Sequence, residues 1–122
     1  MKIKKALLAI TLALALSACV PVEEKHFDVK LLHGEWLEGT VHDTYLEGGK
    51  GYSWDTSDDI TEEDASPFEW RLSYDTLQVN HALWNGAVVP KVYIVTTLDS
   101  LQLDYYEFNT GLEHHYTKVS NP

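Results

Sequence analysis

The densest group of potential metal ligands in this chain is an acidic segment, residues 55–65, which holds six aspartates and glutamates. Its oxygen-bearing residues match the first three ligand positions of an EF-hand calcium loop at Asp55, Ser57 and Asp59. Ile60 stands where that loop needs glycine, and Ser66 stands where it needs a bidentate glutamate, so the pattern excludes an EF-hand. A looser carboxylate site for a cation stays open. Its candidate ligands are Asp55, Asp58 and Asp59.

No other residue pattern supports metal binding or catalysis. The six histidines lack zinc spacing, and the adjacent His114 and His115 would point to opposite faces of a strand. The chain contains no Gly-x-Ser-x-Gly motif, and the glycines of residues 48–51 are typical of a hairpin turn rather than a phosphate loop. The carboxylates are abundant, but no spacing fixes a pair of them. The sequence therefore predicts a protein that is not an enzyme and has no cofactor and no resident metal.

Aromatic side chains are the second group of residues that could bind a ligand: the chain has four tryptophans and seven tyrosines. If some of them line a cavity, they favour a planar or apolar ligand, with His81 or Arg71 as a polar anchor. The candidate ligand-binding residues are Trp54, Trp70, His81, Tyr93 and Tyr105. The alternative is that the aromatic residues simply fill the core of a small domain that has no disulfide.

The elements that must position these residues follow a β pattern beyond Gly34. Apolar and polar residues alternate in several segments, which is typical of strands with one face on a core. The expected strands include residues 68–72, 77–81, 88–96, 101–106 and 116–119. Turn signals separate them at short intervals, and the sharpest is Asn85-Gly86. Such regular spacing predicts a sandwich or an up-and-down barrel.

Two segments depart from the strand pattern. Residues 28–34 predict one helical turn, with Asp28 as the N-cap and Gly34 as the terminator. The acidic segment is interpreted as a loop or lid at one end of the fold. Thr61 and Asp64 within it form a weak capping-box pattern, which predicts a short helical turn there.

The start of the chain has the pattern of a secretory signal. Three lysines precede an apolar stretch, residues 6–16, which is too short to span a bilayer. The stretch ends in Leu-Ser-Ala-Cys at residues 16–19, which resembles the bacterial lipobox. That resemblance implies cleavage before Cys19 and lipidation of Cys19, the only cysteine. The predicted organisation is a lipoprotein signal peptide at 1–18, a lipidated tether at 19–30 and one domain at 31–122.

The charge of the chain argues against nucleic acid as a partner. The formal net charge is −10, and loss of the three signal lysines would make it −13. Such an acidic body repels nucleic acid and anionic lipid surfaces. The expected membrane contact is therefore the lipid anchor and not the protein surface.

The segment Gly34-Glu35-Trp36, after a helical turn and before a series of hairpins, resembles the first motif of the lipocalins. The resemblance implies an all-β, eight-stranded antiparallel up-and-down barrel whose closed end is plugged by Trp36. It also implies a basic residue from the last strand packed across the indole, and Lys118 takes that place although the family norm is arginine. Residues 51–70 and 86–93 resemble small lipocalin-like lipoproteins of Bacteroides-type bacteria, and the resemblance covers about residues 31 to 119.

Two functions from different classes follow from this sequence. The first is a non-enzymatic, lipid-anchored binder of a small apolar or aromatic ligand inside the barrel. The alternative is a filled barrel that docks an envelope protein or glycan through its acidic loops. By resemblance to enteric-type lipoproteins, Val20 after the cysteine implies export to the outer membrane, and Glu23-Glu24 resembles an acidic signal for the cell surface.

Overall fold

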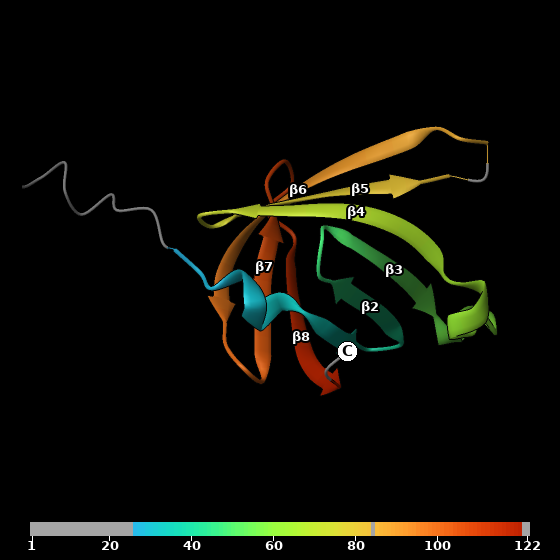
Figure 1. Cartoon of the computed structure of the whole chain (residues 1–122), viewed down its shortest axis with the longest axis horizontal. Coiled ribbons are helices and arrows are strands. Elements are labelled where there is room, and N and C mark those ends of the chain that lie inside the picture. Colours follow the sequence, from blue (N-terminus) through green and yellow to red (C-terminus); the bar gives the residue numbers. More distant parts are fainter. Residues whose placement is uncertain (1–25, 84, 121–122) are drawn as a thin grey trace, which may run out of the picture.

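The structure is a computed structural model, and it describes residues 26–83 and 85–120. Its eight strands form a closed barrel in which each strand pairs antiparallel with its neighbours in sequence and the first strand pairs with the last (Figure 1). This confirms the predicted all-β, eight-stranded up-and-down barrel. The strands are β1 (Gly34–Glu38), β2 (Val41–Leu46), β3 (Lys50–Asp55), β4 (Ser66–Ser73), β5 (Thr76–Ala82), β6 (Val88–Leu98), β7 (Gln102–Glu107) and β8 (Glu113–Ser120).

Three short 3₁₀ turns complete the fold: η1 (Val29–Leu32), η2 (Thr56–Asp58) and η3 (Glu62–Asp64). η1 precedes β1 at one end of the barrel, whereas η2 and η3 lie between β3 and β4 at the other end. Figure 1 shows η1 on the left and both the η2–η3 segment and the tip of the β5–β6 hairpin on the right. We call the η1 end the closed end and the opposite end the open end.

The closed end is filled by apolar side chains. Asp28 caps η1 by accepting a hydrogen bond from the Lys30 amide at 3.0 Å. The turn seats Leu32 over the barrel, and both Leu32 and Trp36 are fully buried. The helical turn thus forms where the sequence predicts it, but His33 is its C-cap, and Gly34 is already the first residue of β1.

Alternation places one face of each strand in the core. In β4, for example, Phe68 and Trp70 are buried while Glu69 and Arg71 are exposed. Gly51 of β3 pairs with Phe68, and a Cβ at Gly51 would lie 2.4 Å from the Phe68 ring. The aromatic ring therefore occupies the space that any larger residue at position 51 would need.

The acidic segment folds as a loop at the open end that contains η2 and η3. The capping-box prediction is wrong in detail, because the Thr61 side chain makes no cap hydrogen bond to η3. Residues 29–30, which the predicted tether includes, belong to η1. The predicted signal peptide and Cys19 lie outside the described residues.

Candidate functional site

The interior of the barrel contains a cavity of about 140 Å³ in its open half. The cavity is lined by apolar side chains, by four tyrosines and by three further polar residues. These are Val41, Phe68 and Val79, then Tyr45, Tyr93, Tyr105 and Tyr116, and finally Asp43, Ser53 and His81. The hollow therefore combines aromatic ring surface with hydroxyl, imidazole and carboxyl groups.

Strand register explains how a carboxylate comes to lie inside the barrel. Asp43 of β2 is directly opposite Trp36 of β1, and paired residues share a face of the sheet. Because Trp36 points into the core, Asp43 does so as well. Asp43 is only 8 % exposed to solvent. The same alternation places Tyr45, two residues further on, in the interior.

The Asp43 carboxyl group is the central charged group of the cavity. Burial and the nearby Glu38 raise its pKa, and hydrogen bonds from the Ser53 and Tyr116 hydroxyls together with the nearby His81 oppose that shift, but the pKa stays above the ordinary value of 3.8. An ionised carboxylate can accept about four hydrogen bonds, so these two donors leave part of its capacity for a ligand or water.

The side chains of Tyr45, Tyr105 and Tyr116 line the same cavity as this carboxylate, and a hydrogen bond from Tyr116 lowers the pKa of Asp43. Burial raises the pKa of each of these phenols well above the ordinary value of 10.0, so all three stay protonated and can act as donors. Burial also raises the pKa of Tyr93 to about 12.

His81 supplies the cavity with an imidazole from β5. It pairs with Phe68 across β4 and β5, and the two ring centroids are 5.6 Å apart. Burial lowers the pKa of His81, the negative charge of Asp43 raises it, and Lys91 lowers it again, so the net shift is downward. His81 is accordingly a neutral imidazole near pH 7.

A second histidine lies beside the cavity at the open end. His114 Nδ1 is 2.8 Å from Glu38 Oε1, and His114 Nε2 is 3.0 Å from Glu107 Oε2. Burial lowers the pKa of His114, but hydrogen bonds to Glu107 and Glu38 outweigh this effect and raise it above 6.5. The ring lies 5.3 Å from that of Tyr105, which places this carboxylate-flanked histidine at the edge of the cavity.

Three of the five predicted ligand-binding residues come together in this cavity: His81, Tyr93 and Tyr105. Trp54 lies elsewhere, because it pairs with His42 on the outward-facing side of β2 and β3. There its ring stacks on His42 at 4.7 Å and on Tyr52 at 5.7 Å. The alternation of β3 points Ser53, and not Trp54, into the barrel.

Trp70 faces the core but does not line the inner cavity. Its ring packs edge-on against Tyr45 at 5.7 Å and against His33 at 5.8 Å, toward the closed end. The Trp70 Nε1–H donates to the Lys50 carbonyl oxygen at 2.7 Å. Trp70 therefore acts as a core residue that ties β4 to β3.

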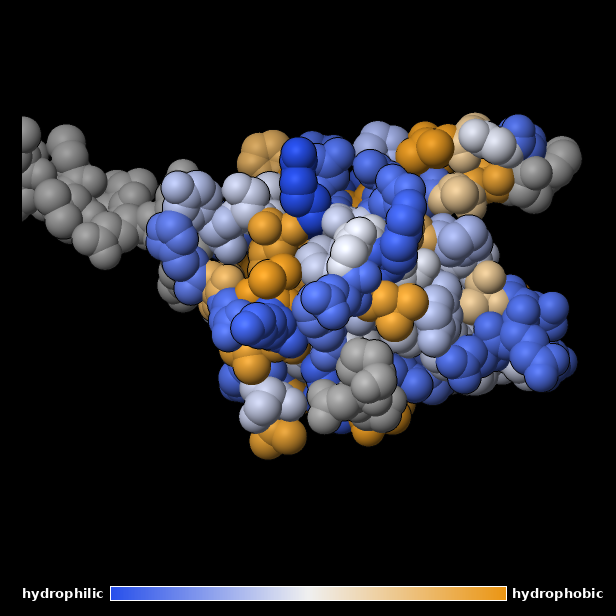
Figure 2. Space-filling model, in the orientation of Figure 1, coloured by the Kyte–Doolittle hydropathy of each residue, from blue (hydrophilic) through white to orange (hydrophobic). Residues whose placement is uncertain are grey.

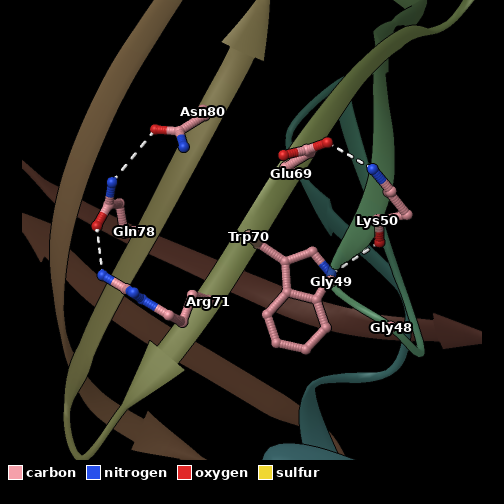
Figure 3. A pocket seen from close by; sticks show the side chains of 8 residues that line it. All are labelled: Gly48, Gly49, Lys50, Glu69, Trp70, Arg71, Gln78 and Asn80. Atoms are coloured by element: carbon pink, nitrogen blue, oxygen red, sulfur yellow. Dashed lines mark hydrogen bonds and ion pairs between the residues drawn. The ribbon is translucent and has the colours of Figure 1, made fainter.

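A groove of about 320 Å³ lies outside the barrel along β4 (Figure 3). Its polar side chains are hydrogen-bonded to one another: Arg71 donates to Gln78 at 3.1 Å, Gln78 donates to Asn80 at 3.4 Å, and Lys50 pairs with Glu69. A more apolar hollow of about 490 Å³ continues toward the open end, between Lys50, Phe68 and Val88.

Two residues of the candidate cation site, Asp55 and Asp59, have structural roles within the protein. The Asp55 carboxylate accepts hydrogen bonds from the Thr40 hydroxyl at 2.7 Å and from the Ser57 amide and hydroxyl at 2.9 and 2.7 Å. These bonds lower the pKa of Asp55 and hold the start of η2. Asp59 is the C-cap of η2 in a left-handed conformation. Within residues 26–83 and 85–120, no group of three His, Cys, Asp or Glu side chains is arranged to hold a metal ion.

Comparisons with family models, with curated proteins and with solved structures give no match for this chain. In the part of the chain that the structure describes, no helix is long and apolar enough to cross a membrane.

Sequence reasoning missed the acidic centre of the cavity and the carboxylate-flanked histidine at its edge. Asp43 could have been found from the alternation of residues 41, 43 and 45, because an acid in register with two apolar residues would share their face. The partners of His114 could not have been found in this way, because Glu38 is distant in sequence and meets His114 only when the barrel closes.

Proposed function

We propose that this protein is a non-enzymatic binding protein of lipocalin-like type, which holds a small ligand in the open half of its barrel. The observation that carries the proposal is the asymmetry of the interior. Leu32 and Trp36 fill the closed end, whereas a cavity of about 140 Å³ lies among polar and aromatic side chains in the open half. Concave sites lined by aromatic surface with a few convergent polar groups are the usual form of small-molecule sites.

The size and lining of the cavity restrict the ligand. Pockets for drug-sized ligands measure about 300–1,000 Å³, and a liquid water molecule takes about 30 Å³, so this cavity has the volume of roughly five waters. Asp43, Ser53 and His81 add polar groups to its aromatic walls. A small ligand with one apolar or aromatic part and one polar group therefore fits this lining better than a purely apolar one.

The location that we propose is the outer membrane of a bacterial envelope, with the barrel tethered by a lipid on Cys19. The support is the lipobox-like sequence at residues 16–19 and the short apolar segment before it. The tether would then lead to η1 at the closed end, which leaves the open end facing away from the point of attachment.

Native mass spectrometry of the lipoprotein extracted from its own host tests this function. We expect a population with added mass beyond that of the lipid anchor. Val41→Phe, which places a ring in the cavity, should lose that added mass while circular dichroism still shows a folded barrel. Wild-type protein without added mass that also fails to bind any member of a small-molecule library would contradict the proposal.

A second candidate function is docking of an envelope protein or glycan by the outer surface. The observation that favours it is a hydrophilic lobe formed by the acidic segment, with a notch between it and the β5–β6 hairpin, which carries exposed apolar residues near its end (Figure 2). Among these apolar residues Leu83 is 44 % exposed and Val88, the first residue of β6, is 59 % exposed. A partner that co-purifies with wild type but not with Glu63→Lys, from a barrel without internal ligand, would favour this function over the first.

A further inference from the structure

The tyrosines place several hydroxyl groups around one carboxyl group in the inner cavity. Tyr45, Tyr105, Tyr116 and Ser53 line this cavity together with Asp43, and hydrogen bonds from Ser53 and Tyr116 lower the pKa of that carboxyl. Each phenol has one O–H donor and can also accept. The oxygens of these groups can therefore accept hydrogen bonds from a molecule in the cavity.

The charges around the cavity favour the same kind of ligand. Asp43 places a carboxyl group inside the barrel, and His81 is a neutral imidazole that can accept a hydrogen bond. At the edge of the cavity, His114 lies between the carboxylates of Glu38 and Glu107, so that this group carries one net negative charge when His114 is protonated. Lys91 lies nearby on β6 and is exposed to solvent.

The aromatic walls add a further attraction for a cation. The Tyr93 and Tyr105 ring centroids are 4.4 Å apart, and those of Tyr105 and Tyr116 are 5.5 Å apart, so three rings lie together beside the carboxylate. A ring face attracts a positive charge placed within about 6 Å of its centroid.

We propose that the ligand of this cavity is a small primary ammonium compound, whose N–H groups donate to Asp43 and to the tyrosine oxygens. This inference rests on the proposed binding function and specifies its ligand class. A primary ammonium group has three donors and one positive charge. It therefore complements a wall that offers acceptors, one buried carboxylate and ring faces, and the small volume limits the rest of the molecule to a short chain.

Calorimetric titration of the full-length lipoprotein in detergent, near neutral pH, tests the inference with matched probes. Propylammonium and propanol have the same shape but differ in charge and donors, and tetramethylammonium has the charge without N–H groups. We expect propylammonium to bind about tenfold or more tightly than either of the others, because a hydrogen bond to a charged group contributes about that much.

Two substitutions and one control locate the binding. Asp43→Asn should weaken propylammonium binding about tenfold or more and remove the preference over propanol. Asp104→Asn makes the same chemical change on the outer face of β7, where Asp104 bonds His115, and should leave the affinity unchanged. Val41→Phe should abolish binding of all probes.

The outcomes separate this inference from the function on which it rests. Equal affinity for propylammonium and propanol, or an ammonium preference that survives Asp43→Asn, would overturn the ammonium inference and leave a binding cavity in place. Ammonium binding that survives Val41→Phe would assign it to the acidic surface and would also overturn the inference. No binding of any probe, together with native protein that carries no ligand, would overturn both.

Discussion

At the scale of single residues, the closed end depends on the contacts of one tryptophan. The Trp36 Nε1–H donates to the Leu32 carbonyl oxygen at 2.8 Å, and the Lys118 amine lies 4.5 Å from the centre of the ring. That amine also donates to the carbonyl oxygens of Leu31 and His33. Lys118 thus joins the last strand both to the indole and to the C-terminal end of η1.

These contacts predict unequal costs for three substitutions, measured as the free energy of unfolding in urea. Trp36→Ala should cost about 3–5 kcal/mol, because it leaves a cavity in the core. Lys118→Met should cost about 2–3 kcal/mol, since it removes the cation and leaves two carbonyl groups without their donor. Lys118→Arg keeps the charge and donors and should cost less than about 1 kcal/mol. A Lys118→Met protein as stable as wild type would contradict this account.

At the scale of secondary-structure elements, the barrel closes through the pairing of β1 with β8. Their last described pair is Leu37 with Thr117, and beyond it the Glu38 side chain continues the link. One carboxylate oxygen accepts the His115 amide at 2.5 Å, and the other lies 2.8 Å from His114 Nδ1. His114 then reaches Glu107 of β7, so one imidazole connects three strands at the open end.

This link predicts that the stabilisation from His114 depends on pH. The pKa of His114 is raised above 6.5, so its contribution is fully present below that pH and is lost as pH rises through the folded-state value. The hydrogen bond from His114 lowers the pKa of Glu107 below 4.5, so this contribution is lost only in acid. The loss of stability in His114→Gln should therefore be larger near pH 5.5 than near pH 8.5.

Chemical denaturation of wild type and variant at both pH values measures that difference. His26→Gln is the matched control. His26 precedes η1 in the chain and packs against Tyr74, with the two ring centroids 4.1 Å apart. This substitution removes a histidine that lies outside the Glu38–His114–Glu107 link. A destabilisation by His114→Gln that is equal at both pH values, or larger in alkali, would refute the charged link.

At the scale of the whole molecule, the two ends of the barrel have separate tasks in our proposal. The closed end carries η1, through which the chain would reach its lipid anchor, and the open end carries the cavity and the acidic segment. Binding and anchoring would then not compete for the same surface. The predicted lipid anchor at Cys19 can be tested directly in cells.

We expect Cys19→Ser to release the protein from membranes or to leave an uncleaved precursor, because serine offers no thiol for lipid transfer. Metabolic labelling with a fatty acid, followed by membrane fractionation, measures both effects. The Asp104→Asn protein is a suitable control with an intact cysteine. Wild-type protein that takes up no label would show that the lipoprotein interpretation is wrong.

Much of this fold could be predicted from the sequence, because alternation and turn chemistry are local. The periods of residues 68–72 and 77–81 mark strands that form as β4 and β5. The placement of individual aromatic residues was less predictable. Trp54 and Trp70 are similar in type and burial, yet one covers the outside of the sheet and the other fills the core, because a shift of one position along a strand exchanges its faces.

The sequence by itself determined the strand periods of this protein, its acidic balance and its aromatic content. Only the tertiary structure decided which residues meet, including Trp36 and Lys118. Asp43, Tyr105 and His81 come from three different strands, and closure of the barrel brings them to one cavity. Such a site depends on register and strand order across the whole sheet, which no local pattern encodes, because each pairing is fixed by the burial of all the others.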